Sequence, residues 1–145
     1  VEEKEMSAEP LMMAYLASHE TYKAGDIIIE EGSKGDWVYV VLEGQVKVTK
    51  RTSVGMLTID VLKEGSIFGE MALFGNALQA RSASVIAADG DARVGVLDTR
   101  QLIEDYESLS LELRLLLKSL IMGLKESNEK AAALVVAANE KSSGG

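Results

Sequence analysis

Two short segments of the chain decide its fold: Phe68-Gly69-Glu70-Met71-Ala72-Leu73 and, after a loop, Arg81-Ser82-Ala83-Ser84-Val85. Gly69 has no side chain, so a ligand can approach its backbone, and the N–H groups that open the following helical turn attract anions. Arg81 can hold two oxygens of one phosphate with its planar guanidinium. Glu70 would be repelled by that phosphate, and a ribose hydroxyl would suit it as a donor. The residues therefore predict a small pocket for a phosphate attached to a sugar.

The same residues resemble the phosphate-binding cassette of cyclic nucleotide-binding domains, which reads F-G-E-x-A-L, a loop and R-x-A-x-V. The resemblance implies that Arg81 binds the cyclic phosphate and that Glu70 binds the ribose 2′-hydroxyl. It implies that other cassette residues line the site: Phe68, Gly69, Met71, Ala72, Ser82 and Ala83. Many members of the family have proline before the arginine, where this chain has Ala80. The resemblance extends over about residues 22–130.

Length and charge narrow the class of protein. We expect the 145 residues to form one domain, and a net charge of −8 argues against binding to nucleic acid or to an anionic membrane. The chain contains no cysteine, which suits a reducing compartment, so we expect a cytoplasmic protein. No apolar run is long enough for a membrane helix. The chain opens at Val1 rather than Met, which is compatible with a piece of a longer protein.

The sequence pattern divides the chain into three parts. Residues 9–18 are predicted to form a short helix, and residues 99–140 two further helices. Between them, residues 21–98 show about eight short strands separated by glycine-containing turns, with the cassette at 68–85. This pattern indicates an α+β fold, an antiparallel β-roll or jelly-roll with a short N-terminal helix and two C-terminal helices, the last one long.

Two of the predicted turns are specific. Gly44 lies between two alternating segments and predicts a turn there. Asp89-Gly90-Asp91 separates two further segments and predicts the turn of a hairpin.

The C-terminal part predicts a dimerisation helix. Asp98-Thr99 is typical of a helix start, residues 100–107 form a short helix, and a long helix covers residues 109–140. Residues alternately four and three apart form a heptad seam on this long helix: Leu113, Leu117, Leu120, Leu124, Ser127, Ala131, Leu134 and Ala138. A parallel homodimer would bury the seam. The alternative is a helix that packs only on its own β-roll.

Three polar residues bear on which nucleotide binds. The segment G-L-K-E-S-N-E-K at 123–130 resembles the helix of the family's dimeric transcription factors, where hydroxyl residues contact the adenine amino group. The resemblance implies base contacts from Ser127 and Asn128, although a polar pair that fixes helix register is an equal alternative. In the family, threonine after the arginine is associated with cyclic GMP. This chain has Ser82 there, so cyclic AMP is favoured and cyclic GMP stays open.

The residue inventory argues against an enzyme. His19 is the single histidine and there is no cysteine, so a metal site or a nucleophile with a base partner is not expected. The predicted function is a regulatory sensor: the nucleotide binds between the β-roll and the long helix, and the signal leaves through that helix. The competing interpretation is a dimerising β-roll that acts as an interaction module without a nucleotide ligand.

Overall fold

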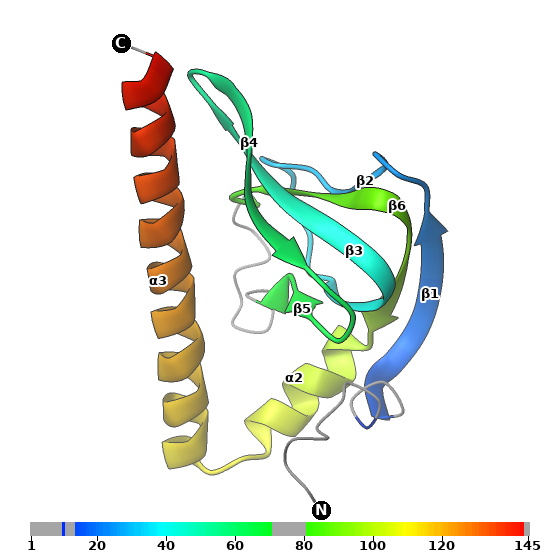
Figure 1. Cartoon of the computed structure of the whole chain (residues 1–145). Coiled ribbons are helices and arrows are strands. Elements are labelled where there is room, and N and C mark those ends of the chain that lie inside the picture. Colours follow the sequence, from blue (N-terminus) through cyan, green and yellow to red (C-terminus); the bar gives the residue numbers. More distant parts are fainter. Residues whose placement is uncertain (1–9, 11–13, 71–80, 144–145) are drawn as a thin grey trace, which may run out of the picture.

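The computed structural model describes residue 10 and residues 14–70 and 81–143. Within them, six strands form one antiparallel sheet that closes on itself as a roll (Figure 1). The strands are β1 (Leu16–Tyr22), β2 (Ile27–Ile29), β3 (Val38–Thr52), β4 (Gly55–Leu62), β5 (Ile67–Phe68) and β6 (Ser84–Leu97). The sheet runs β1-β6-β3-β4, with β2 paired to β6 and β5 to β3. Two helices follow the roll and the second is long, which confirms the predicted fold class.

The core lies in two clusters that are neighbours along β3, since Val40 belongs to the smaller one and the adjacent Val41 to the larger one. Val46 of β3 is fully buried in the larger cluster, inside the roll, and Val48 packs against the same cluster. Side chains alternate between the two faces of a strand, so the intervening Lys47 lies on the other face. The smaller cluster joins Leu97 to residues at the start of β3, and Leu102 packs against it. This second cluster seats the first C-terminal helix on the roll.

The turns predicted at Gly44 and at Asp89-Gly90-Asp91 are wrong, because both segments lie inside long, continuous strands. β3 and β6 stay paired on both sides of this point, from Glu43↔Arg93 to Gln45↔Ala88, and the pairing is irregular between them. Gly44 has φ +81°, and a Cβ there would lie 2.6 Å from the carbonyl oxygen of Asp91. The two strands thus bend together at a shared bulge. This continuity explains why six strands are described where about eight were predicted.

The predicted helix over residues 9–18 ends earlier than expected. Pro10 and residues 14–15 are helical, residues 11–13 lie outside the described part, and β1 begins at Leu16. Leu16 pairs with Leu97 at the edge of β6, and the Tyr15 carbonyl accepts a hydrogen bond from the Asp98 N–H at 2.7 Å. Tertiary pairing with β6 therefore overrides the local helical pattern of residues 16–18.

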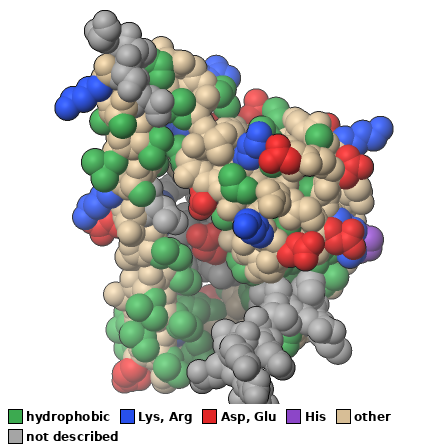
Figure 2. Space-filling view, viewed as in Figure 1, with side chains coloured by type: hydrophobic (Ala, Val, Ile, Leu, Met, Phe, Trp, Pro, Cys, Tyr) green, Lys and Arg blue, Asp and Glu red, His purple; other side chains and the backbone are tan. Residues whose placement is uncertain are grey.

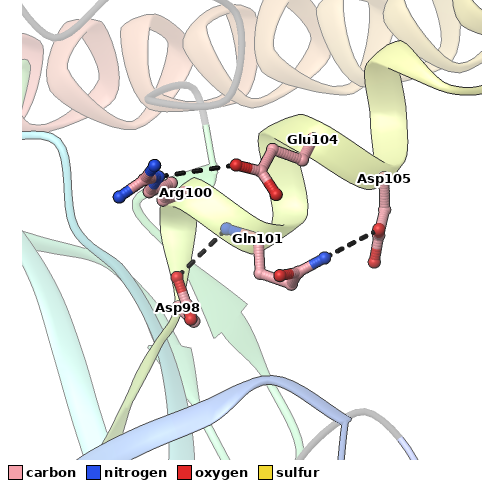
Figure 3. Close-up of polar contacts among 5 residues, drawn as sticks. All are labelled: Asp98, Arg100, Gln101, Glu104 and Asp105. Carbon is pink, nitrogen blue, oxygen red and sulfur yellow. Dashed lines mark hydrogen bonds and ion pairs between the residues drawn. The ribbon is translucent and has the colours of Figure 1, made fainter.

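The helix α2 (Thr99–Glu107) begins where the sequence predicts it. The Asp98 carboxylate accepts a hydrogen bond from the Gln101 N–H at 3.0 Å and caps the helix (Figure 3). One turn further on, Gln101 donates to Asp105 at 3.0 Å. Asp105 also accepts a hydrogen bond from the Tyr15 hydroxyl at 2.5 Å, so α2 is tied to the segment that precedes β1.

The helix α3 (Leu111–Ser143) is 33 residues long and stands beside the roll, which it contacts at β4 (Figure 1). It begins two residues later than predicted, because the Ser110 hydroxyl caps it by accepting from the Leu113 N–H at 3.2 Å. No helix within the described residues is long and apolar enough to cross a membrane.

Candidate functional site

The structure brings Arg81 and Gly69 together at one end of the roll. The Arg81 guanidinium donates a hydrogen bond from Nη2 to the Trp37 carbonyl oxygen at 3.2 Å. Gly69 has φ +78°, and a Cβ there would lie 2.7 Å from that oxygen and 3.2 Å from Arg81 Nη1. A side chain at this position would push against both groups. Gly69 therefore leaves room for the Trp37 carbonyl and the guanidinium, and the predicted approach of a ligand to its backbone stays a prediction.

Two stacked aromatic rings lie close to Gly69. Phe68 is 5% exposed, and its ring stacks on Tyr39 with 5.0 Å between centroids and 12° between planes. Burial raises the pKa of the Tyr39 hydroxyl, whereas the nearby positive charge of Arg81 lowers it. The guanidinium thus lies close enough to Tyr39 to favour its charged form, although burial has the larger effect.

The main chain that carries Arg81 is held by the turn after β2. The Arg81 N–H donates to the Ser33 carbonyl at 2.7 Å, and the Gly32 N–H donates to the Arg81 carbonyl at 2.8 Å. Three residues on, the Ser84 hydroxyl accepts from the Glu31 N–H at 2.8 Å. These contacts join segments about fifty residues apart, so the sequence alone did not reveal them.

Lys50 holds the same main chain from the other side, which the sequence analysis also missed. Its ammonium group donates a hydrogen bond to the Ser82 carbonyl at 2.7 Å. Arg81 and Ser82 are therefore fixed before any ligand arrives, which reduces the ordering that binding would require.

The remaining predicted site residues divide into three groups. Glu70 is half-buried and lies two residues after the end of β5. Ser82 is exposed and Ala83 half-buried beside Arg81. Met71 and Ala72 lie outside the described residues, as does the side chain of Asn128. Ser127 lies on α3, a separate element, and is exposed there. The structure thus brings together the cassette residues around Arg81 that it describes, whereas the predicted base contacts lie on another element and stay a prediction.

Two open spaces lie around the roll, one beside α3 (Figure 2) and one near the start of α2. Figure 2 shows a gap between α3 and the roll, with acidic side chains at its edge. The second hollow is a half-open pocket of about 400 Å³ where β1, Trp37 and the start of α2 meet. Trp37 links this pocket to Arg81, since its carbonyl accepts a hydrogen bond from the guanidinium.

Much of α3 presents apolar side chains to solvent. Leu134 is 72% exposed, and the other large seam residues are exposed as well: Leu113, Leu117, Leu120 and Leu124. Exposed apolar stripes of this length mark interaction surfaces. The alternative prediction was a helix that buries its seam on its own roll, and these exposed leucines do not fit it.

Comparison with known proteins fits this arrangement. The sequence model of the family described as "Cyclic nucleotide-binding domain" matches residues 19–107. The chain belongs to this family. A curated relative, the cGMP-dependent protein kinase egl-4 of Caenorhabditis elegans, is 39% identical over 102 residues, which are 67% of this chain and 13% of the kinase. The chain thus spans only a small part of such relatives.

Solved structures agree on the fold. The EAL enzyme Bd1971 in its cyclic AMP and cyclic-di-GMP bound form has a TM-score of 0.67 and 32% identity, covering 87% of this chain and 33% of that one. The same enzyme has been solved with cyclic GMP bound and in a half-site-occupied form. The catabolite activator protein of Thermus thermophilus has a TM-score of 0.60 and 26% identity, covering 91% of this chain and 58% of its own.

Proposed function

We propose that this chain is a regulatory domain that binds cyclic AMP in its cassette and transmits the signal through α3. The position of Arg81 carries the proposal. A guanidinium has five N–H donors in a rigid fork, and one of them reaches the Trp37 carbonyl above Gly69 and Tyr39. A cyclic phosphate would replace that neutral carbonyl with a charged acceptor, and a charge-assisted bond is about twice as strong. Glu70 would accept a hydrogen bond from the ribose hydroxyl.

The choice of cyclic AMP rests on three residues. Ser82 stands where family members that bind cyclic GMP are associated with threonine, and Ser127 and Asn128 offer contacts to an adenine amino group. Relatives named for cyclic GMP and a neighbour solved with either nucleotide make cyclic GMP the alternative to be tested.

Signal transfer would follow from the contacts around Trp37. If the phosphate displaces the Trp37 carbonyl from Arg81, the start of β3 is released on one side. Val38 next to it pairs with Leu97, which leads through the Asp98 cap into α2. We propose that this path biases the angle between α2 and α3, because the ligand binds one arrangement more tightly than the other.

A second copy of the chain is the proposed partner for α3. The exposed seam is continuous, polar only at Ser127, and small at Ala131 and Ala138, which favours close parallel helices. The half-site-occupied form of Bd1971 supports a paired arrangement in a structural neighbour. We further propose a cytoplasmic location, from the absence of cysteine, and no direct contact with nucleic acid, from the charge of −8.

Thermal unfolding with cyclic AMP, cyclic GMP and AMP tests the function. At about a hundred times the dissociation constant a ligand adds about 2.7 kcal/mol to the unfolding free energy. We expect the largest rise in Tm with cyclic AMP and none with AMP. Arg81→Ala should abolish the rise, whereas the matched control Arg51→Ala, an exposed arginine on β3, should keep it.

The outcomes separate the candidates. A larger rise with cyclic GMP would contradict the choice of nucleotide and keep the site. No rise with any nucleotide would leave a dimerising β-roll that acts as an interaction module.

A further inference from the structure

Lys50 lies near the end of β3, across from the segment that carries Arg81. Thr49 pairs with Ser84 across β3 and β6, so Lys50 comes level with Ala83 as the strands separate. Val46 and Val48 pack in or against the inner core, but the pairing of β3 with β4 is irregular between Val48 and Thr49, and Thr49 is buried as well. The half-buried Lys50 follows this irregularity. Its ammonium group reaches the Ser82 carbonyl at 2.7 Å.

This contact holds Ser82, the residue that is expected to distinguish cyclic GMP from cyclic AMP. Ser82 makes no ladder contact of its own, since β6 begins at Ser84. Its main chain is held from the Arg81 side by the turn at Gly32 and Ser33. The Lys50 bond is the contact described on its own carbonyl.

We propose that Lys50 is a specificity-determining positioning residue: by holding the Ser82 carbonyl it fixes where the Ser82 hydroxyl meets the base. The proposal rests on the proposed function and extends it to base selection. Without the ammonium, Ser82 can rotate about its main chain and a hydrogen bond to the guanine amino group loses its geometry. Binding of cyclic AMP, for which Ser82 offers no such bond, depends on Lys50 much less.

Calorimetric titration of both nucleotides into the full chain tests this. We expect Lys50→Met to raise the dissociation constant for cyclic GMP about tenfold, as the loss of one charge-assisted hydrogen bond implies, and that for cyclic AMP by less than about threefold. Lys50→Arg keeps a donor and should restore the ratio of the two constants. Arg51→Met removes the same charge one residue away and should leave the ratio unchanged, because Arg51 contacts Glu31 through its main-chain N–H.

A double-mutant cycle shows whether Lys50 acts through Ser82. In a Ser82→Ala background, Lys50→Met should no longer change the ratio. An unchanged ratio in Lys50→Met alone, or an equal change in both backgrounds, would overturn the proposal while the nucleotide-binding function stands. No binding by the unmodified chain would instead overturn the function itself, and this inference with it. Thermal unfolding without nucleotide checks that each variant is folded, and Lys50→Gln replaces Lys50→Met if that variant is not.

Discussion

The roll and α3 are both rich in hydrophobic residues, but the roll buries many of them and α3 leaves most of them exposed. In the roll, Val40, Val46 and Ala92 are completely buried. On α3, Leu120 is 62% and Leu134 72% exposed. Burial of apolar area stabilises by roughly 25 cal/mol per Å², so the roll has gained this energy within one chain and α3 has not. The difference teaches that the roll carries the buried core within this chain, and it supports the proposal that α3 meets another surface.

Leucine truncations in the two regions should give the largest contrast. Leu97 is 1% exposed and belongs to the cluster that seats α2, so we expect Leu97→Ala to lower the unfolding free energy by about 2–5 kcal/mol. Leu134→Ala should change it by less than about 0.5 kcal/mol at low protein concentration, where the chain is monomeric. Urea unfolding followed by Trp37 fluorescence measures both. Equal losses would mean that α3 packs on its own roll after all.

A charged residue introduced on the seam of α3 should weaken the dimer, whereas the same residue on the opposite face should not. Leu120→Glu places a carboxylate in the proposed dimer interface, where a central residue contributes about 2 kcal/mol or more, so the dimer dissociation constant should rise about thirtyfold or more. Met122→Glu places the same charge away from the seam and should leave it nearly unchanged. Sedimentation equilibrium measures both. Similar dissociation constants for the two variants would contradict the heptad seam.

A smaller effect should appear at high pH, and α3 should contribute nothing to it. Burial and, next, a hydrogen bond to Glu20 raise the pKa of Tyr22 from 10.0 to about 12, and α3 contains no tyrosine. The folded state keeps the Tyr22 proton that the unfolded chain releases, so this contribution is complete below pH 10 and is lost as pH rises toward 12. Tyr22→Phe should therefore flatten the fall in urea midpoint between pH 10 and 12. Burial of Tyr39 leaves part of the fall in place, and a slope identical to that of the unmodified chain would contradict the Tyr22 assignment.

Local chemistry made the start of α2 predictable, whereas the shared bulge of β3 and β6 could not be predicted from the local sequence. Asp98 was expected to start a helix because its carboxylate can accept from a first-turn N–H, and it does so with Gln101. Gly44 and Asp89-Gly90-Asp91 carry the residue types of turns, but a bulge needs the same positive φ angles. Only the partner strand decides between the two, and the partner lies far along the chain. The early start of β1 at Leu16 has the same cause.

In the candidate site, too, some residues could be recognised from the local sequence and others could not. Gly69 and Arg81 were recognisable from the sequence because each needs a special residue type, and the structure places them in contact. Lys50 was missed because its bond to Ser82 joins residues 32 positions apart. Its local signal is weak, because a lysine near the end of a strand is usually an exposed surface charge.

The length of α3 gives it a mechanical advantage. It joins α2 at one end, and its other end stands beside the β3–β4 hairpin (Figure 1). At 1.5 Å per residue, its 33 residues form a rigid arm of about 50 Å. A rotation of about 10° at the α2–α3 joint would therefore sweep the far end through about 9 Å, a displacement of nearly one helix diameter. Repacking of sub-ångström size around Arg81 could in this way be read out at the opposite end of the molecule.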